Sequence, residues 1–279
     1  MPSAICTACG IQFPDAALPP GCCPICEDSR QFVPPTGQSW TTMDALAKAH
    51  RNAYRRYETD LIGVGTSPRF GIGQRALLLR HPEGNLLWDC ITLLDDATVE
   101  IVRALGGIRA IAISHPHYYT TMVEWAHAFG AQVHLHAADR AWVMRPDAAL
   151  RFWTGDRMRL WGDLELLRIG GHFTGGTVLH APRAAEGRGA LLSGDIIQVA
   201  PDRRSTAFMW SYPNYIPLAA SAVRRIGCAV EALAFDRVYG AFWDSNIERA
   251  GKAAVARSVE RYLHAIGDGP AGISDGNDR

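Results

Sequence analysis

The stretch that decides the fold is IAISHPHYYTT, residues 111–121. The alternation around isoleucine over residues 110–114 predicts a short buried strand, and the chain leaves it carrying His115 and His117. In extended chain, residues i and i+2 project to the same side, and Pro116 stiffens the backbone between them, so both imidazoles are expected to face one metal ion. Two ligands do not hold a metal, so others must come from elsewhere in the chain.

The composition is that of an ordinary globular protein. The chain has 279 residues, of which 48% are hydrophobic and 20% charged, and its formal net charge is zero. This balance gives no general attraction to nucleic acid or to a membrane surface. The N-terminus lacks the pattern of a signal peptide, and no stretch approaches the roughly 20 apolar residues that span a bilayer. We therefore expect a cytoplasmic protein that binds neither nucleic acid nor membrane, and the sequence leaves its oligomeric state open.

The cysteines are crowded at the N-terminus, with five of the seven in the first 26 residues. Cys6 and Cys9 form one C-x-x-C turn, and Cys23 and Cys26 form another. Two such turns supply four sulfurs for tetrahedral Zn²⁺, although a redox pair or disulfides would use the same spacing. Residues 1–33 resemble a zinc ribbon, or a shortened rubredoxin-like pair of knuckles. Cys22 is an extra thiol that could replace Cys23 as a ligand.

Beyond the ribbon, the pattern predicts alternating strands and helices. We divide the chain into a ribbon (1–33), a linker with a helix at 42–57 (34–59), a main domain (60–266) and a disordered tail (267–279). Strands are expected at 61–64, 74–80, 85–89, 110–114, 132–135, 164–169, 177–180, 190–193 and 237–239, and further helices at 96–105, 120–129, 137–144, 217–232 and 247–266. Two successive sets of strands and helices suggest two sheets sandwiched between helices.

Two later motifs offer the missing ligands. The segment GGHFTGGT, residues 170–177, places His172 in a glycine-rich loop directly after a strand, and LLSGD, residues 191–195, ends a strand with Asp195. With the SHPH motif at 114–117, these segments resemble the metallo-β-lactamase-fold superfamily in order, spacing and flanking glycines. The resemblance covers residues 60–266 and implies an α+β fold, a four-layer αβ/βα sandwich. It is less specific for chemistry, because the superfamily hosts many reactions.

The first motif departs from the family pattern His-x-His-x-Asp-His, because Tyr119 and Thr120 replace the aspartate and the last histidine. The resemblance implies a first metal site of His115, His117 and His172. A second ion would share Asp195 and need a final histidine, but none occurs at residues 238–243.

These absences predict one metal ion, Zn²⁺ or Fe²⁺, in the main site. Asp195 would either ligate that ion or accept a hydrogen bond from its water. Tyr119 would either donate to a developing oxyanion or only fill the volume of the lost ion.

We therefore expect a metallo-hydrolase that activates water against a small ester, thioester, amide or lactone. The aromatic segment 201–217 is a candidate pocket wall, with Trp210 and Tyr212 as substrate contacts and Arg203 as a grip for an anionic group. One alternative is a mononuclear Fe(II) dioxygenase of the persulfide dioxygenase type, with His115, His172 and Asp195 as a facial triad. Another is a non-catalytic partner-binding module. Residues 6–26 contain no basic residue, which argues against nucleic acid as that partner.

Overall fold

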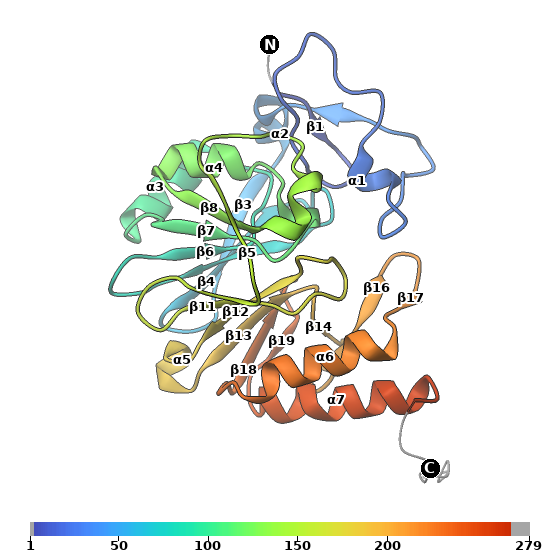
Figure 1. Cartoon of the computed structure of the whole chain (residues 1–279). Coiled ribbons are helices and arrows are strands. Elements are labelled where there is room, and N and C mark those ends of the chain that lie inside the picture. The colour runs from blue at the N-terminus through green and yellow to red at the C-terminus, as the bar shows by residue number, and fades with distance from the viewer. Residues whose placement is uncertain (1–2, 269–279) are drawn as a thin grey trace.

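The computed structural model describes residues 3–268, in which two β-sheets lie face to face between two layers of helices (Figure 1). The seven-stranded sheet has the spatial order β3 (Arg51–Arg56), β4 (Leu61–Ser67), β5 (Arg75–Leu79), β6 (Leu86–Trp88), β7 (Ala110–Ala112), β8 (Gln132–His136) and β9 (Leu150–Trp153). The six-stranded sheet has the order β10 (Arg157–Arg159), β11 (Glu165–Arg168), β12 (Thr177–Ala181), β13 (Ala190–Gly194), β18 (Arg237–Gly240) and β19 (Asn246–Ile247).

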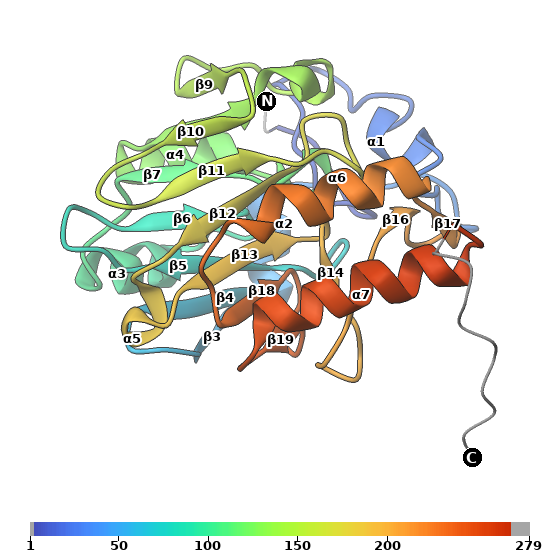
Figure 2. The same ribbon diagram turned by 60° about the horizontal axis from the view of Figure 1, so that its bottom comes forward.

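Helices cover the outer face of each sheet. Helices α3 (Asp96–Ala104) and α4 (Met122–Phe129) lie on the seven-stranded sheet, and α6 (Ala220–Glu231) and α7 (Gly251–Ala265) lie side by side on the six-stranded one (Figure 2). The smaller elements are β1 (Ile5–Cys6), α1 (Pro24–Glu27), β2 (Trp40–Thr41), α2 (Met43–Ala49), the 3-10 turns η1 (Pro116–Tyr118) and η2 (Ala137–Trp142), α5 (Ala184–Gly187), β14 (Gln198–Val199), β15 (Thr206–Ala207), β16 (Met209–Ser211) and β17 (Ile216–Pro217). The predicted four-layer αβ/βα sandwich is thus confirmed. None of the helices in the described part of the chain has the length and apolarity that a membrane crossing requires.

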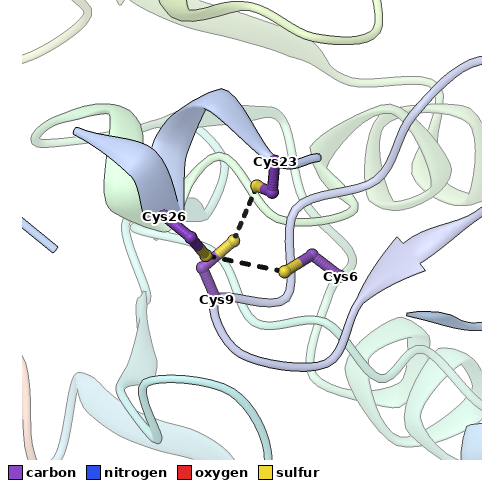
Figure 3. Close-up of side chains that lie close together, drawn as sticks. All are labelled: Cys6, Cys9, Cys23 and Cys26. Carbon is purple, nitrogen blue, oxygen red and sulfur yellow. Dashed lines mark hydrogen bonds between the residues drawn. The ribbon is translucent and has the colours of Figure 1, made fainter. Parts of the chain in front are cut away.

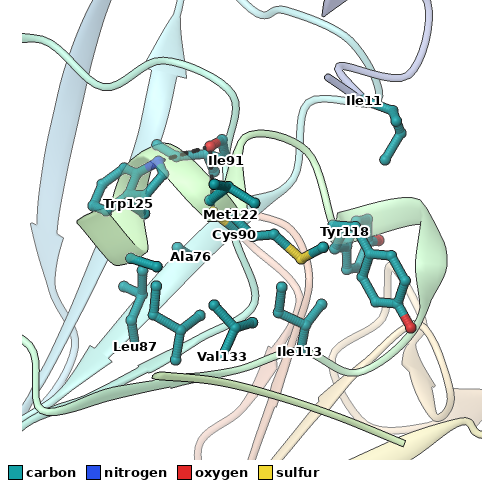
Figure 4. Close-up of a cluster of buried hydrophobic side chains, with 14 of the residues drawn as sticks. Ile11, Ala76, Leu87, Cys90, Ile91, Ile113, Tyr118, Met122, Trp125 and Val133 are labelled. Atoms are coloured by element: carbon teal, nitrogen blue, oxygen red, sulfur yellow. Dashed lines mark hydrogen bonds between the residues drawn. The ribbon is translucent and has the colours of Figure 1, made fainter. Parts of the chain in front are cut away.

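Buried apolar side chains form three clusters in the described chain. They lie on different faces of the sheets because successive side chains of a strand point to opposite faces. In β5, Leu78 joins the cluster beneath α3 and α4, while Leu77 and Leu79 point the other way and join the cluster between the sheets. Figure 4 shows part of the first cluster, in which the indole of Trp125 on α4 donates to the backbone carbonyl of Ile91 at 3.0 Å. Because both faces of the sheet are covered, its central strands are apolar throughout rather than alternating with polar residues.

The ribbon shares the first cluster with the main domain. Ile11, which follows the first pair of cysteines, is buried in it (Figure 4). Gly10 has a φ of +82°, and a Cβ there would lie 2.1 Å from Oγ1 of Thr92, so only glycine allows this approach. The Thr92 hydroxyl donates to the Gly10 carbonyl at 3.2 Å, and the backbone N–H of Gln12 donates to the Thr120 carbonyl at 3.1 Å. The ribbon is therefore packed on the main domain rather than tethered beside it.

Several predicted elements were wrong. The helix expected at 42–57 ends with α2 at Ala49, and residues 51–56 form β3, an edge strand of the main sheet within the segment assigned to the linker. Along β3 the pattern is mostly polar and exposed, so the sequence carries little strand signal there. The helix predicted at 137–144 is the 3-10 turn η2, and α7 begins at Gly251 because β19 precedes it. Apart from its first two residues, the predicted disordered tail lies outside the described residues.

Strand directions bring the site residues to one edge. Strands β6, β7 and β8 run parallel, as do β13 and β18, so their carboxyl ends lie together. Asp89 follows β6, His115 comes three residues after β7, and Asp195 follows β13. The backbone N–H of Thr177, at the start of β12, donates to the Ser114 carbonyl at 2.9 Å and joins the two sheets beside the site. The fold thus gathers residues far apart in the sequence.

Candidate metal centres

The four predicted cysteine ligands converge in the ribbon (Figure 3). The sulfurs of Cys6 and Cys26 are 3.6 Å apart, as are those of Cys9 and Cys23, and all four thiols are buried. Zn–S bonds of about 2.3 Å in a tetrahedron place sulfurs about 3.8 Å apart, so these distances fit one zinc ion. Cys22 is exposed and lies outside the cluster, so Cys23 rather than Cys22 is the candidate ligand.

Burial without a cation does not suit these thiols. Desolvation is the largest influence on Cys9 and raises the pKa of its thiol well above the ordinary value. Thiolates become favourable there only when a positive ion balances them. The amide of Gln38 lies 3.1 Å from the sulfur of Cys6, where it donates to the thiolate. The donor set therefore fits a structural metal ion.

The three predicted histidines also converge, with ligand atoms within 4.8 Å of one another. Nδ1 of His117 and Nε2 of His172 are 3.2 Å apart. With Zn–N bonds of about 2.0–2.1 Å, neighbouring corners of a tetrahedron are about 3.3 Å apart, so this pair has the spacing of two ligands of one ion. Nε2 of His115 is buried without a hydrogen-bond partner in the described structure, which leaves its lone pair available to a cation.

Second contacts orient two of these rings. Nδ1 of His172 lies 2.8 Å from the backbone carbonyl of Trp210. Because a carbonyl only accepts, Nδ1 must carry the hydrogen, and Nε2 is left as a bare acceptor for a metal. Nδ1 of His115 lies 2.8 Å from the Ser114 hydroxyl, which directs the opposite nitrogen into the site. In both His115 and His172, one ring nitrogen is thus held by a neighbouring protein group and the other faces the site.

The local backbone differs from the expectation that His115 and His117 share an extended segment. His115 is extended (φ −168°, ψ 169°), but His117 lies within the 3-10 turn η1, which begins at Pro116. The turn, rather than strand alternation, brings the second imidazole beside the first, with ring centroids 5.0 Å apart.

Burial keeps the histidines neutral. The three side chains are 1–2% exposed, and desolvation lowers the pKa of each, to about 4 for His172. A neutral imidazole has a lone pair to offer, whereas a protonated one repels a cation. The cluster is therefore in the state that metal binding requires at neutral pH.

Asp195 is not one of the three members of this cluster, but it is joined to it through Tyr118, whose ring centroid lies 4.4 Å from that of His115. Its Oδ2 accepts a hydrogen bond from the Tyr118 hydroxyl, and its Oδ1 is buried without a partner in the described structure. Desolvation raises the pKa of this carboxyl to about 7. A second buried carboxyl, that of Asp89, also has its pKa raised to about 7 by burial, and its Oδ1 accepts from the backbone N–H of Ser114 at 2.7 Å. Both carboxyls can therefore exchange a proton near neutral pH.

Of the other predicted site residues, the structure places Tyr212 near the histidines, but Arg203 and Tyr119 make their contacts elsewhere. Tyr212 donates to the backbone carbonyl of Asp195 at 2.9 Å and its ring lies 5.6 Å from that of His172. Arg203 is instead an exposed residue that pairs with Asp244 at 3.3 Å. Tyr119 is buried in the first core cluster, while its neighbour Tyr118 makes the contact with Asp195.

Arg30 also lies at this site, although the sequence analysis did not predict it. It follows the last cysteine of the ribbon, and its Nη1 lies 3.4 Å from the His172 carbonyl, 142 residues away. Its guanidinium carbon lies 3.8 Å from the ring centroid of Phe173. The one available signal was that this is the first basic residue after a ribbon core that has none.

The sequence contains a second H-x-H, at residues 134–136, whose last histidine is held by backbone groups. Nε2 of His136 lies 3.0 Å from the Gly155 carbonyl, and its Nδ1 accepts from the backbone N–H of Ala138 at 3.2 Å. Both nitrogens of that ring are thus occupied by backbone groups.

Comparison with solved structures agrees with the fold. Solved structures with the same fold include the metallo-β-lactamase DIM-1 exposed to ceftazidime (14% identity, TM-score 0.55, covering 76% of this chain and 98% of that one) and VMB-1 (10% identity, TM-score 0.56, covering 77% and 98%). A third is a B3 metallo-β-lactamase with an active-site glutamic acid (17% identity, TM-score 0.51, covering 76% and 89%). Fold and histidine cluster together define a protein with the metallo-β-lactamase fold, a three-histidine candidate metal site and a four-cysteine N-terminal module.

No protein-family model matches the chain. A curated relative from Bacillus subtilis (strain 168), the uncharacterized protein YmaE, is 47% identical over 268 residues, which cover 95% of this chain and 97% of that protein. The chain belongs to the same family as YmaE.

Proposed function

We propose that the protein is a metal-dependent hydrolase that acts on a small ester, thioester, amide or lactone with a single metal ion in the histidine site. The observation that carries this proposal is the convergence of three neutral imidazoles, His115, His117 and His172, beside one buried carboxylate. Three imidazoles with an open fourth position are the ligand set of hydrolytic zinc sites. Such an ion supplies a water of lowered pKa and polarises a carbonyl group.

Asp195 is the candidate proton acceptor. Burial raises the pKa of this carboxyl to about 7 in the metal-free protein, and a cation in the histidine site would lower it, so the carboxyl is ionised at neutral pH and can take a proton there. The Tyr118 hydroxyl holds Oδ2, so Oδ1 is the oxygen left to orient or deprotonate water. The hydrogen bond also favours the ionised form and keeps the pKa from rising further.

The surroundings favour a small substrate. The ring of Tyr212 lies 5.6 Å from that of His172, and the ring of Trp210 lies 5.5 Å from the guanidinium carbon of Arg30, so aromatic side chains stand near the histidines, as in the wall of a small-molecule site. Arg203 is directed elsewhere by its pairing with Asp244, so it does not supply a grip for an anionic group in this conformation.

The test is turnover of a panel of acyl esters, thioesters and lactones by zinc-loaded protein. Asp195→Asn, which keeps the shape of the carboxyl but not its basicity, is expected to lower kcat by about 10²–10⁴-fold at unchanged metal content. His134→Ala, which alters the other H-x-H, is the matched control and should leave turnover unchanged. Equal turnover by Asp195→Asn and wild type would refute the assigned role.

The alternative iron site would use His115, His172 and Asp195 as ligands. In the structure, His115 and His172 group with His117 and not with Asp195. This grouping favours the three-imidazole site and a hydrolase. Elemental analysis of protein purified without added metal distinguishes the two proposals, because iron at one equivalent per chain would favour the oxygenase.

A further inference from the structure

The segment that follows the last ribbon cysteine lies against the histidine site. We call residues 28–31, Asp28 to Gln31, the ribbon loop. Within it, Arg30 is held by Asp28 through two parallel contacts, Nε to Oδ1 at 2.6 Å and Nη2 to Oδ2 at 3.0 Å. This bidentate pair fixes the plane of the guanidinium, and the two side chains are only 12% and 18% exposed.

That guanidinium packs on the loop that carries a metal ligand. Nη1 of Arg30 donates to the His172 carbonyl at 3.4 Å, and its central carbon lies 3.8 Å from the ring centroid of Phe173, the next residue. Trp142 lies on another side, with its ring centroid 5.0 Å from the same carbon. Arg30 therefore restrains both the backbone of His172 and the side chain beside it.

A hairpin of the main domain holds the ribbon loop and the imidazole together. Nδ2 of Asn214, in the turn between β16 and β17, donates to the carbonyls of Ser29 and Gln31 at 2.8 and 3.0 Å. On the same hairpin, the carbonyl of Trp210 accepts from Nδ1 of His172. His172 is thus held from two sides, and each side also contacts the ribbon loop.

The ribbon loop is in turn fixed by the cysteine cluster. Cys26 lies on α1, a helix of four residues, and the backbone N–H of Asp28 donates to the Pro24 carbonyl at its end. A helix of one turn has no stability of its own in water, so a metal ion on the cysteines is what fixes the direction in which the chain leaves α1.

We propose that the cysteine site and the histidine site are coupled, with Arg30 as the positioning residue that transmits the state of the ribbon metal to His172. An ion in the ribbon orders the ribbon loop and thereby raises the affinity of the histidine site for its own ion. Contacts that orient a metal ligand are typically worth 10–100-fold in affinity, so we expect an effect of that size. Because coupling is reciprocal, an ion in the histidine site tightens the ribbon by the same factor. This inference goes beyond the hydrolase proposal, since it holds for any chemistry at the histidines.

Titration with Co²⁺ tests the coupling without any substrate. Cobalt bound by four thiolates has intense charge-transfer absorption that cobalt bound by imidazoles lacks, so the two sites are followed separately in the full chain. Arg30→Met retains much of the stem length but loses the contacts of the guanidinium, and it should weaken the histidine site by 10–100-fold while the ribbon still binds cobalt. Arg103→Met, at an exposed arginine of α3, is its matched control and should bind as wild type does.

The second pair of variants removes the ribbon metal. Cys26→Ser should weaken the histidine site by a similar factor, whereas Cys22→Ser, at the exposed thiol outside the cluster, should not. The double variant Arg30→Met/Cys26→Ser should bind no more weakly than either single variant, because both break one path.

Wild-type affinity of the histidine site in either Arg30→Met or Cys26→Ser would overturn the proposal, as would full additivity in the double variant. Should Cys26→Ser not fold, wild-type affinity in Arg30→Met would still overturn it, because that variant keeps all four cysteines. Failure of the hydrolase proposal leaves these results unaffected, since they measure metal affinity and not turnover.

Discussion

Replacing His172 with alanine should empty the histidine site and leave the ribbon loaded. Two groups of ligands are present in the described chain, so the wild type is expected to bind two metal ions per chain. In His172→Ala the ring nitrogen that stands 3.2 Å from Nδ1 of His117 is lost, and two imidazoles remain.

The size of the effect follows from the ligand count. Loss of a group that only orients a ligand costs about 10–100-fold in metal affinity, so loss of a ligand itself should exceed the upper value, about 2.7 kcal/mol. At a free zinc concentration ten times the wild-type dissociation constant of this site, occupancy should fall from about 90% to below about 10%.

The assay is elemental analysis after equilibrium dialysis in a zinc buffer. His134→Ala is the matched control and should retain both ions, because that residue belongs to the structural H-x-H on β8. Two ions per chain in His172→Ala, or loss of an ion in His134→Ala, would refute the assignment of the site.

Three further predictions follow from the same structure. At a zinc concentration that still saturates the histidine site, Cys23→Ser should remove one zinc ion per chain and lower the unfolding temperature, whereas Cys22→Ser should do neither, as elemental analysis and thermal unfolding will show. Tyr118→Phe removes the hydrogen bond that favours ionised Asp195. Because hydrogen bonds to charged groups contribute about 1.5–3 kcal/mol, the acidic limb of the pH–kcat profile should move up by about 1–2 pH units. An unchanged acidic limb would contradict the role of this contact. Burial raises the pKa of Asp139 to about 6, so its protonated carboxyl favours the folded state below pH 4 and this contribution is lost as the pH rises through 6. In Asp139→Asn, the fall in the free energy of unfolding between pH 4 and 7 should therefore be smaller, by on the order of 1–3 kcal/mol in denaturant titrations. An unchanged fall would contradict this prediction.

The ligands themselves could be identified from the sequence because their motifs are local. A C-x-x-C turn fixes the distance between two sulfurs within four residues, and both pairs, 6–9 and 23–26, do meet as expected. The histidines at 115, 117 and 172 stand directly after short apolar strands or in a glycine-rich loop, and such positions lie at a sheet edge in any sandwich of this kind. Apolar periodicity was strong in the central strands, because both faces of each sheet are buried.

What only the tertiary structure decided involves contacts between distant segments. Strand β3 is exposed and mostly polar, and it is stabilised by pairing with β4. Its sequence lacks the apolar alternation of a strand, and a helix was therefore predicted there. Which tyrosine touches Asp195 depends on the turn η1, which brings the hydroxyl of Tyr118 to a carboxylate 77 residues away. The same holds for Arg30, whose contact with the His172 carbonyl spans 142 residues. Sequence patterns record the chemistry of a residue and its near neighbours, whereas the approach of two such segments is set by the packing of the whole sandwich.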